Sequence, residues 1–273
     1  MRVILSRKGF DSAAGGMPSP ILPDGRLCSL PIPADAQGDR PADPQRYDEI
    51  SVQGTPLSQW LTELAPRRQH PIHAHHDPDI DPASRPRRPG WRPNLGQIGG
   101  AQRHLIDQGV GPGDLFLFFG WFRQTEHHQG ALRWARGAPD QHIVFGYLQV
   151  ESLQPLGLDD PLPDWAADHP HARPWRRARP NNALWVARER LTHRHLPGAG
   201  LFTNRDDRVL TAPGGGPRSL WQLPPCLRPC FISHHSPHSW RGDHFQSVAR
   251  GQELVVHATE EAVDWAIRLI DPT

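Results

Sequence analysis

Proline and glycine are the residues that most limit how this chain can fold. Its 273 residues include 31 Pro and 25 Gly, roughly twice the usual share of these two residues in globular proteins. Proline has no backbone N–H to donate inside a helix, and glycine loses the most conformational freedom when it is ordered. Long helices are therefore excluded over most of the chain, and we expect a loop-rich protein instead of a helical bundle.

The apolar segments predict a sheet with few helices. Strands are predicted at residues 2–6, 113–123 and 142–153, with several shorter ones in the second half, and helices at 56–66, 94–110 and 259–270. No internal repeat and no clear linker divides the chain. We therefore predict a single α+β domain over residues 1–273, with a mixed or antiparallel, partly barrel-like sheet and a few flanking helices.

Charge and composition restrict the classes of partner. With 30 Lys+Arg against 29 Asp+Glu, the chain has no general polyanion-binding surface, so a nucleic-acid site must be local. The arginine-rich stretch 169–194 is one such local patch. No segment approaches the roughly 20 apolar residues that cross a bilayer, and the apolar run at the N-terminus is too short for a signal peptide. We expect a cytoplasmic protein without membrane contact, whose 3 Cys are reduced structural thiols.

Histidine clusters with carboxylates in HPIHAHHDPDID, residues 70–81, although a GC-rich genome explains much of the abundance of the 17 His. Alternate residues of an extended segment point the same way, so His75, Asp77 and Asp79 are expected to converge. Pro78 disfavours a helical conformation at Asp77. Imidazoles and carboxylates together suit iron, zinc or manganese. The alternative is a solvated polar loop.

Two further histidine pairs are candidates for completing such a site. His234 and His235 follow a short apolar stretch, and His169 and His171 flank Pro170 beside a basic run. Two histidines with one carboxylate form the ligand face of non-haem Fe(II) oxygenases. Additional carboxylates would permit two metals, and the spacing does not decide between one and two.

The loop after the first predicted strand carries Arg7, Lys8, Asp11 and Ser12, and Lys8 is the only lysine of the chain. Loops at strand ends are common places for binding groups. Arg7, Lys8 and Ser12 would hold an anionic substrate group, and Asp11 would be a ligand or a base. A surface turn is the alternative reading. Glu253 lies in an apolar strand, where a carboxylate must face solvent, pair with a cation such as Arg250, or act at a site.

Seven strings across nearly the whole chain resemble the nucleotide-modification-associated domain family of type 3. They are SRKGFDSAAGGMPSPILPDGRLCSLPIP, HHDPDI, GVGPGDLFLFFGWFR, HIVFGYLQV, NALWVA, GAGLF and RGQELVV. The first and the fourth are the most specific. The resemblance implies a role in modifying nucleic-acid bases, but it supplies neither a reaction nor catalytic residues.

The leading hypothesis is therefore a metal-dependent enzyme that acts on a nucleotide or a nucleic acid. Iron is the expected metal, with zinc or manganese as alternatives. Oxygenase chemistry is favoured over metal-dependent hydrolysis, and the oligomeric state stays open. The expected ligands are His75, Asp77, Asp79, His235 and His234. The expected catalytic residues are Asp11, Lys8 and Glu253, and substrate binding is assigned to Arg7, Lys8, Ser12 and Trp121.

A non-catalytic alternative comes from the strand pair itself. The turn GVGPGD leads into an apolar strand, and the next strand ends in a Gly-aromatic-Leu-Gln-Val pattern. This arrangement is similar to PUA-like barrels, including the EVE and ASCH modules, which bind RNA or modified bases in DNA. A module of that kind needs a base-binding pocket, which the sequence would place near Phe118, Trp121 and Tyr147.

Overall fold

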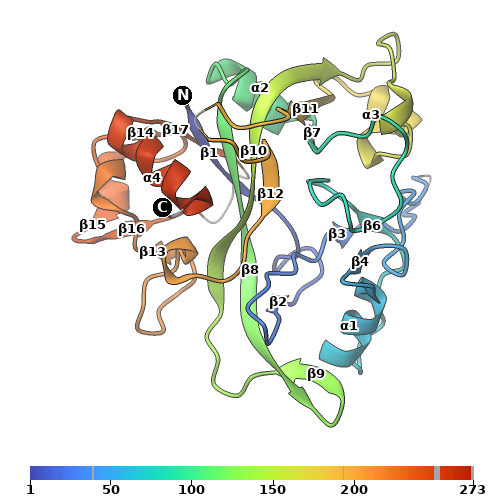
Figure 1. Cartoon of the computed structure of the whole chain (residues 1–273), viewed down its shortest axis with the longest axis horizontal. Helices are drawn as coiled ribbons and strands as arrows, with labels where there is room; N and C mark the ends of the chain where they lie inside the picture. The colour runs from blue at the N-terminus through green and yellow to red at the C-terminus, as the bar shows by residue number, and fades with distance from the viewer. Residues whose placement is uncertain (39, 193, 249–252, 272–273) are drawn as a thin grey trace.

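The framework of the molecule is one mixed sheet. The computed structural model describes residues 1–38, 40–192, 194–248 and 253–271. Within these ranges the sheet has ten strands, and its two longest run through the middle of the molecule (Figure 1). The order along its main path is β14 (Phe231–Ile232), β17 (Glu253–His257), β1 (Val3–Arg7), β8 (Leu115–His128), β10 (Gln141–Pro155), β11 (Ala183–Ala187) and β7 (Asn94–Gln97).

Shorter elements surround this sheet. Three strands pair with it from the side, namely β2 (Ser19–Ile21) and β9 (Ala131–Trp134) on β8, and β12 (Ala199–Leu201) on β10. The small sheets are β3 (Ile32–Pro33) with β6 (Ala74–His75), β4 (Ser51–Val52) with β5 (Thr55–Pro56), and β13 (Leu220–Trp221) with β16 (His244–Gln246) and β15 (Trp240–Arg241). The α-helices of the described ranges are α1 (Leu57–Leu64), α2 (Gly99–Asp107), α3 (Pro174–Arg177) and α4 (Glu260–Ile270).

The central strands form because they are apolar on both faces. Strand β8 begins with six consecutive buried residues, and β10 has nine in a row. Strand β1 lies parallel to β8 and antiparallel to β17, which confirms the prediction of a mixed sheet. Phe116 and Phe118 are fully buried in this core, and each such side chain stabilises the fold by about 1.5–3 kcal/mol.

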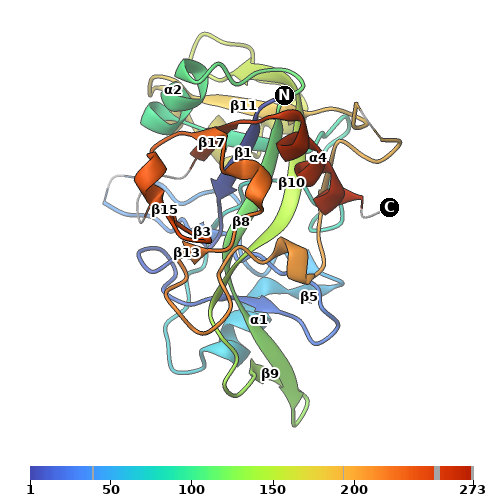
Figure 2. The ribbon, with the colours of Figure 1, turned by 90° about the vertical axis from the view of Figure 1, so that its left-hand side faces the viewer.

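Helices α1 and α4 confirm two helical predictions. In α1 the buried side chains are Leu57, Trp60, Leu61 and Leu64, at helical spacing. Helix α4 begins after Thr259, whose hydroxyl accepts a hydrogen bond from a backbone N–H of the first turn. The two helices lie on opposite sides of the long strands (Figures 1 and 2).

Two predictions about the fold are wrong in part. The helix expected at 94–110 begins only at Gly99, which has a positive φ of 62°. The preceding residues form strand β7, because their backbone pairs with β11 and all four are buried. The expected partial barrel is also wrong. The sheet is not closed, since its path ends at β14 on one side and at β7 on the other.

Candidate metal centre and substrate cavity

His75 and Asp77 lie next to each other in the segment that follows helix α1. His75 is in strand β6, which pairs with β3 and so fixes the extended backbone at this position. The Nδ1–H of His75 donates to Oδ2 of Asp43 at 2.8 Å. The backbone continues through Asp77, whose peptide bond to Pro78 is cis. The convergence of His75 and Asp77, predicted from their alternation, is present.

The third member of the group comes from a distant segment. His171 lies in a 3-10 helix, Pro170–Ala172, and is 3% exposed. Its Nδ1 is 2.7 Å from Oδ1 of Asn182, while the Asn182 amide nitrogen donates to two backbone carbonyls. Because Oδ1 of Asn182 can only accept, Nδ1 of His171 must carry the proton. The Nε2 lone pair is therefore left for a ligand.

His75, Asp77 and His171 each offer one ligand atom, and these atoms lie within 4.8 Å of one another. We call these three residues the metal group, since they are the candidate ligands of a metal ion. In both histidines Nδ1 is already bonded, so Nε2 is the nitrogen that remains. The donor set of two imidazoles and one carboxylate is that of non-haem Fe(II) sites, and it leaves further positions around a metal open. Partners that orient metal-binding histidines in this way are typical of metal sites.

The protonation states of the group also suit a cation. Burial raises the pKa of Asp77, but the His169 ring, whose Nε2 lies 3.6 Å from Oδ1, and the charge of Lys8 outweigh it and hold the pKa well below its ordinary value. Burial lowers the pKa of His171 well below its ordinary value, despite the negative charge of Asp77. At neutral pH the site thus holds a carboxylate and a neutral imidazole, the forms that bind metal.

Gly96 of β7 supports both Asp77 and His171. Its backbone N–H donates to Oδ1 of Asp77 at 2.6 Å. A Cβ at this position would lie 2.3 Å from Cδ2 and 2.7 Å from Nε2 of His171. Only glycine therefore allows the imidazole to lie against strand β7 at this point.

Asp43 bonds both to His75 of the metal group and to the guanidinium of Arg176. It is 2% exposed, and besides His75 it accepts a hydrogen bond from Arg176 of helix α3. Burial raises the pKa of Asp43, but the hydrogen bonds from His75 and Arg176 outweigh it and lower the pKa below its ordinary value. Asp43 is thus ionised at neutral pH and holds the His75 ring in one orientation.

A cavity of about 470 Å³ opens beside the three ligands. Its wall includes four cationic side chains, Arg7, Lys8, Arg40 and Arg176, and the indole of Trp175. The guanidinium of Arg176 stacks on that indole at 4.2 Å from the ring centroid. The volume lies within the range of ligand sites, and guanidinium groups recognise phosphates and carboxylates. The cavity is suited to a small anionic or nucleotide-sized substrate.

Lys8 reaches this cavity from the end of β1 and pairs with Glu253 of β17. Its Nζ lies 3.1 Å from Oε1 of Glu253, and the two side chains are 8% and 1% exposed. Gln97 donates to the same oxygen, while Oε2 has no hydrogen-bond partner among the described residues. Two predicted catalytic residues thus form one buried ion pair. Arg250, the cation expected beside Glu253, lies outside the described residues.

Asp79 is not part of the metal group. The structure gives its carboxylate other partners, since Oδ2 accepts from Arg87 at 2.8 Å and from Trp91 at 3.1 Å. Arg85 forms a further ion pair with it at 3.4 Å. The side chain is 1% exposed. Asp79 therefore anchors the arginines of the 67–93 segment, which is held by ion pairs.

His234 and His235 also lie away from the three ligands, at the β14 end of the sheet. The Nδ1–H of His235 donates to the carbonyl of Ser233 at 2.9 Å, and its Nε2 accepts from the N–H of Val248 at 3.2 Å. His234 stacks on His104 with ring centroids 4.1 Å apart. Both nitrogens of His235 are thus occupied by the protein itself.

The remaining predicted residues divide between two places. Arg7 and Asp11 line the cavity, and Oδ1 of Asp11 accepts two backbone N–H groups of its own turn. Ser12 is exposed and its hydroxyl accepts from Arg218 at 3.1 Å. Trp121 lies against the guanidinium of Arg218, at 3.7 Å from its ring centroid. Neither Ser12, in the loop that follows β1, nor Trp121, in β8, belongs to the wall of this cavity.

The predicted ligand set lacked His171 and its supporting residues. The alternation of His169 and His171 around Pro170 is the available signal in the sequence. It indicates a candidate histidine pair, but it does not show that His171 meets His75 and Asp77. Asp43, Asn182 and Gly96 carried no signal, because each acts through contacts between segments far apart in the chain.

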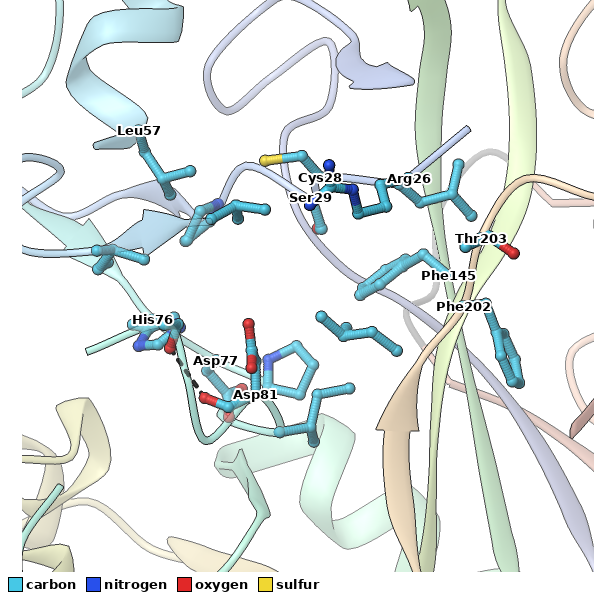
Figure 3. Close-up of a pocket in the computed structure, with 18 residues that line it drawn as sticks. Arg26, Cys28, Ser29, Leu57, His76, Asp77, Asp81, Phe145, Phe202 and Thr203 are labelled. Carbon is cyan, nitrogen blue, oxygen red and sulfur yellow. Dashed lines mark hydrogen bonds between the residues drawn. The ribbon is translucent and has the colours of Figure 1, made fainter. Parts of the chain in front are cut away.

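A second cavity, of about 250 Å³, is lined in part by Asp77 (Figure 3). Its wall is mainly apolar, with Leu57, Phe145 and Phe202 among the lining side chains, and His76 at one edge. Burial lowers the pKa of His76 to about 4, so the imidazole is neutral at physiological pH. Asp77 is common to the walls of both cavities.

The base-binding pocket expected for a PUA-like module is not formed by the three aromatic residues named for it. Phe118 and Tyr147 are buried in the main core, and the Tyr147 hydroxyl donates to the Pro197 carbonyl at 3.0 Å. Trp121 is covered on one face by Arg218. These contacts leave two of the three rings without access to a ligand.

Comparison with known proteins identifies a family. Searches of curated proteins and of solved structures gave no match. Among the described residues, no helix is both long and apolar enough to cross a lipid bilayer. The model of one family, described as nucleotide modification associated domain 3, matches residues 2–257. That match covers most of the chain and indicates a role in nucleic-acid modification. The chain therefore belongs to the nucleotide modification associated domain 3 family.

Proposed function

We propose that the protein is a metal-dependent enzyme that modifies a nucleotide or a nucleic-acid base. The observation that carries this proposal is the group formed by His75, Asp77 and His171, whose ligand atoms lie within 4.8 Å of one another. Each residue of the group is held by a partner that leaves one atom available. Structural polar clusters normally satisfy their members among themselves, whereas this one faces a cavity whose wall includes four cationic side chains as well as four aspartates.

Iron(II) is the metal that this donor set favours. His75, Asp77 and His171 would hold the iron, and with only three protein ligands a bound iron would supply oxygen activation. A hydroxylation of this kind inserts one oxygen atom of O₂ into a substrate C–H bond. The second atom leaves as water, and a two-electron reductant and two protons are consumed. Zinc or manganese in the same ligands would instead support hydrolysis.

The cations of the cavity supply substrate binding. Arg7 and Arg40 lie in the wall together with Arg176, so an anionic group of the substrate would be held on this side. Lys8 has three N–H groups, of which one is directed to Glu253. The other two are suited to donate to a substrate oxygen. Glu253 thereby acts through Lys8, by keeping the ammonium group in place at the edge of the metal group.

The proposal is tested by metal binding to protein purified without an affinity tag. Anaerobic loading with Fe(II) should give close to one equivalent, and the variants His75→Ala, Asp77→Ala and His171→Ala should each lose it. His235→Ala is the matched control, because His235 is a half-buried histidine outside the group. A folded wild type that binds no divalent metal, or a His171→Ala variant that binds as wild type does, would contradict the proposal.

Oxygen consumption separates the two chemistries. An iron-dependent oxidation requires O₂ uptake coupled to a change in the nucleotide, measured with an oxygen electrode and by mass spectrometry. Turnover with zinc or manganese in the absence of oxygen would support the metal site but would show that the enzyme is a hydrolase and not an oxygenase.

A further inference from the structure

Another concave surface lies near the cavity of about 470 Å³ that opens beside His75, Asp77 and His171, called here the metal cavity, and it has a different composition. This groove has a volume of about 440 Å³, and its wall includes Arg67, Arg68, Arg123, Trp121 and Trp134. No carboxylate is present in its wall. Aromatic rings interleaved with arginines are the composition of surfaces that bind single-stranded nucleic acids, because every base has a face that stacks and every phosphate attracts a guanidinium. We call it the Trp121 groove.

One loop, which follows β1, contributes residues to the walls of both the Trp121 groove and the metal cavity. Residues Lys8 and Asp11 line the metal cavity, and residues 16–18 of the same loop line the groove. The distance between the two surfaces can be estimated along strand β8. Arg7 of the metal cavity pairs with Phe119, and Arg123 of the groove lies four residues farther along the strand. At about 3.3 Å per residue this separation is on the order of 13 Å. A strand of two or three nucleotides would span it.

Arg218 links the loop that follows β1 to Trp121 of the groove. Its guanidinium donates to Ser12 of the loop at 3.1 Å and lies 3.7 Å from the centroid of the Trp121 ring. Burial lowers the pKa of Arg218, the negative charges of Asp140 and Asp11 partly offset this, and the positive charges of Arg7 and Arg123 contribute smaller decreases.

We propose that the Trp121 groove binds a single strand of nucleic acid that flanks the nucleotide held in the metal cavity. The substrate is then a polymer, because a free nucleotide would fill the cavity and leave the groove unused. The strand is single because the metal cavity admits one nucleotide-sized group, so a target base must leave a duplex before it enters. This inference rests on the proposed function for the identity of the metal cavity.

The test is strand binding measured by fluorescence anisotropy in a chelating buffer, so that no metal contributes. A labelled single-stranded oligonucleotide of about twelve nucleotides, within the range of single-strand sites, is titrated and then competed with a nucleoside monophosphate. The oligonucleotide should bind far more tightly than the monophosphate. Trp121→Ala should weaken its binding about 5- to 150-fold, the range for loss of one stacked base, while Trp121→Phe, which keeps a ring, should retain most of the affinity.

Salt dependence tests the arginines. Replacing Arg67 by Ala should reduce the slope of log affinity against log salt by about 0.7, the value for one phosphate contact in a single strand. Arg103→Ala is the matched control, since Arg103 is an exposed arginine of α2 that pairs with Asp107 at 2.8 Å. Its removal should leave the slope unchanged.

The outcomes separate this inference from the proposed function. Equal affinity for the monophosphate and the oligonucleotide, or wild-type binding by folded Trp121→Ala and Arg67→Ala, would overturn the groove while leaving metal binding intact. Groove-dependent strand binding by a protein that holds no metal would overturn the proposed enzyme and support the groove.

Discussion

Replacing Gly96 by alanine tests the arrangement of the metal group with a single methyl. The added Cβ would lie 2.3 Å from Cδ2 of His171, whereas ordinary contact begins at 3.4 Å. The imidazole would therefore have to move by about 1.1 Å. Gly96 has no positive φ, so alanine introduces no backbone strain at this position. The effect comes from the contact with His171 alone.

The size of the effect follows from the tolerance of metal sites. Ligand distances in such sites hold to about 0.2 Å, so a displacement of about 1 Å removes His171 from the coordination range. We expect metal affinity to fall about 10- to 100-fold, the effect seen when residues that orient a ligand are changed. Overpacking of the buried ring should also cost about 1–3 kcal/mol of unfolding free energy.

The assay is competition for metal with a coloured chelator, alongside urea unfolding of the metal-free protein. Gly100→Ala is the control, because a Cβ at Gly100 meets nothing within 4 Å. A Gly96→Ala variant that folds and binds metal as wild type does would refute the argument, as would an equal loss in Gly100→Ala.

Two further predictions concern carboxylates. Asp43→Asn should weaken metal binding about 10- to 100-fold, as His75 loses an anionic acceptor. Because the folded protein lowers the pKa of Asp43, this residue stabilises the fold above its ordinary pKa of about 3.9 and loses that contribution as the pH falls through the lowered value. Acid unfolding followed by fluorescence should therefore be less steep in Asp43→Asn. Asp79→Ala should destabilise the protein by about 3–5 kcal/mol, since it removes the carboxylate that pairs with the largely buried side chain of Arg87, while Arg85 keeps its ion pair with Asp168. Metal affinity should stay close to that of the wild type, and a parallel loss of metal would contradict the separation of Asp79 from the site.

Local sequence patterns predict those helices and strands whose own residues carry the apolar spacing that forms them. The spacing of Trp60 and Leu64 was sufficient for α1, and the apolar runs were sufficient for β8 and β10. The local spacing of residues 94–97 predicts a helix. They form a strand because they pair with β11, which lies almost ninety residues later in the sequence. Propensity does not contain that contact.

The candidate site shows the same limit. His75 and Asp77 were found together because their convergence depends on adjacent backbone. Asp79 continues the same alternation, but arginines from its own segment hold it elsewhere. The sequence marks His171 as a candidate ligand but does not place it beside His75 and Asp77, because only the folded chain brings Pro170–Ala172 against β7. Lys8 and Glu253 were singled out separately, and the register of β1 with β17 made them a pair.

The three ligands lie on two segments separated by almost a hundred residues, and Asp43, Gly96 and Asn182 on three more stretches hold them in place. An unfolded chain cannot present these groups together, so a cation that binds them binds only the native state. Mass action then links metal concentration to stability. At a free metal concentration 100 times the dissociation constant, the native state gains about 2.7 kcal/mol. The melting temperature of this protein would consequently report how much metal its surroundings contain.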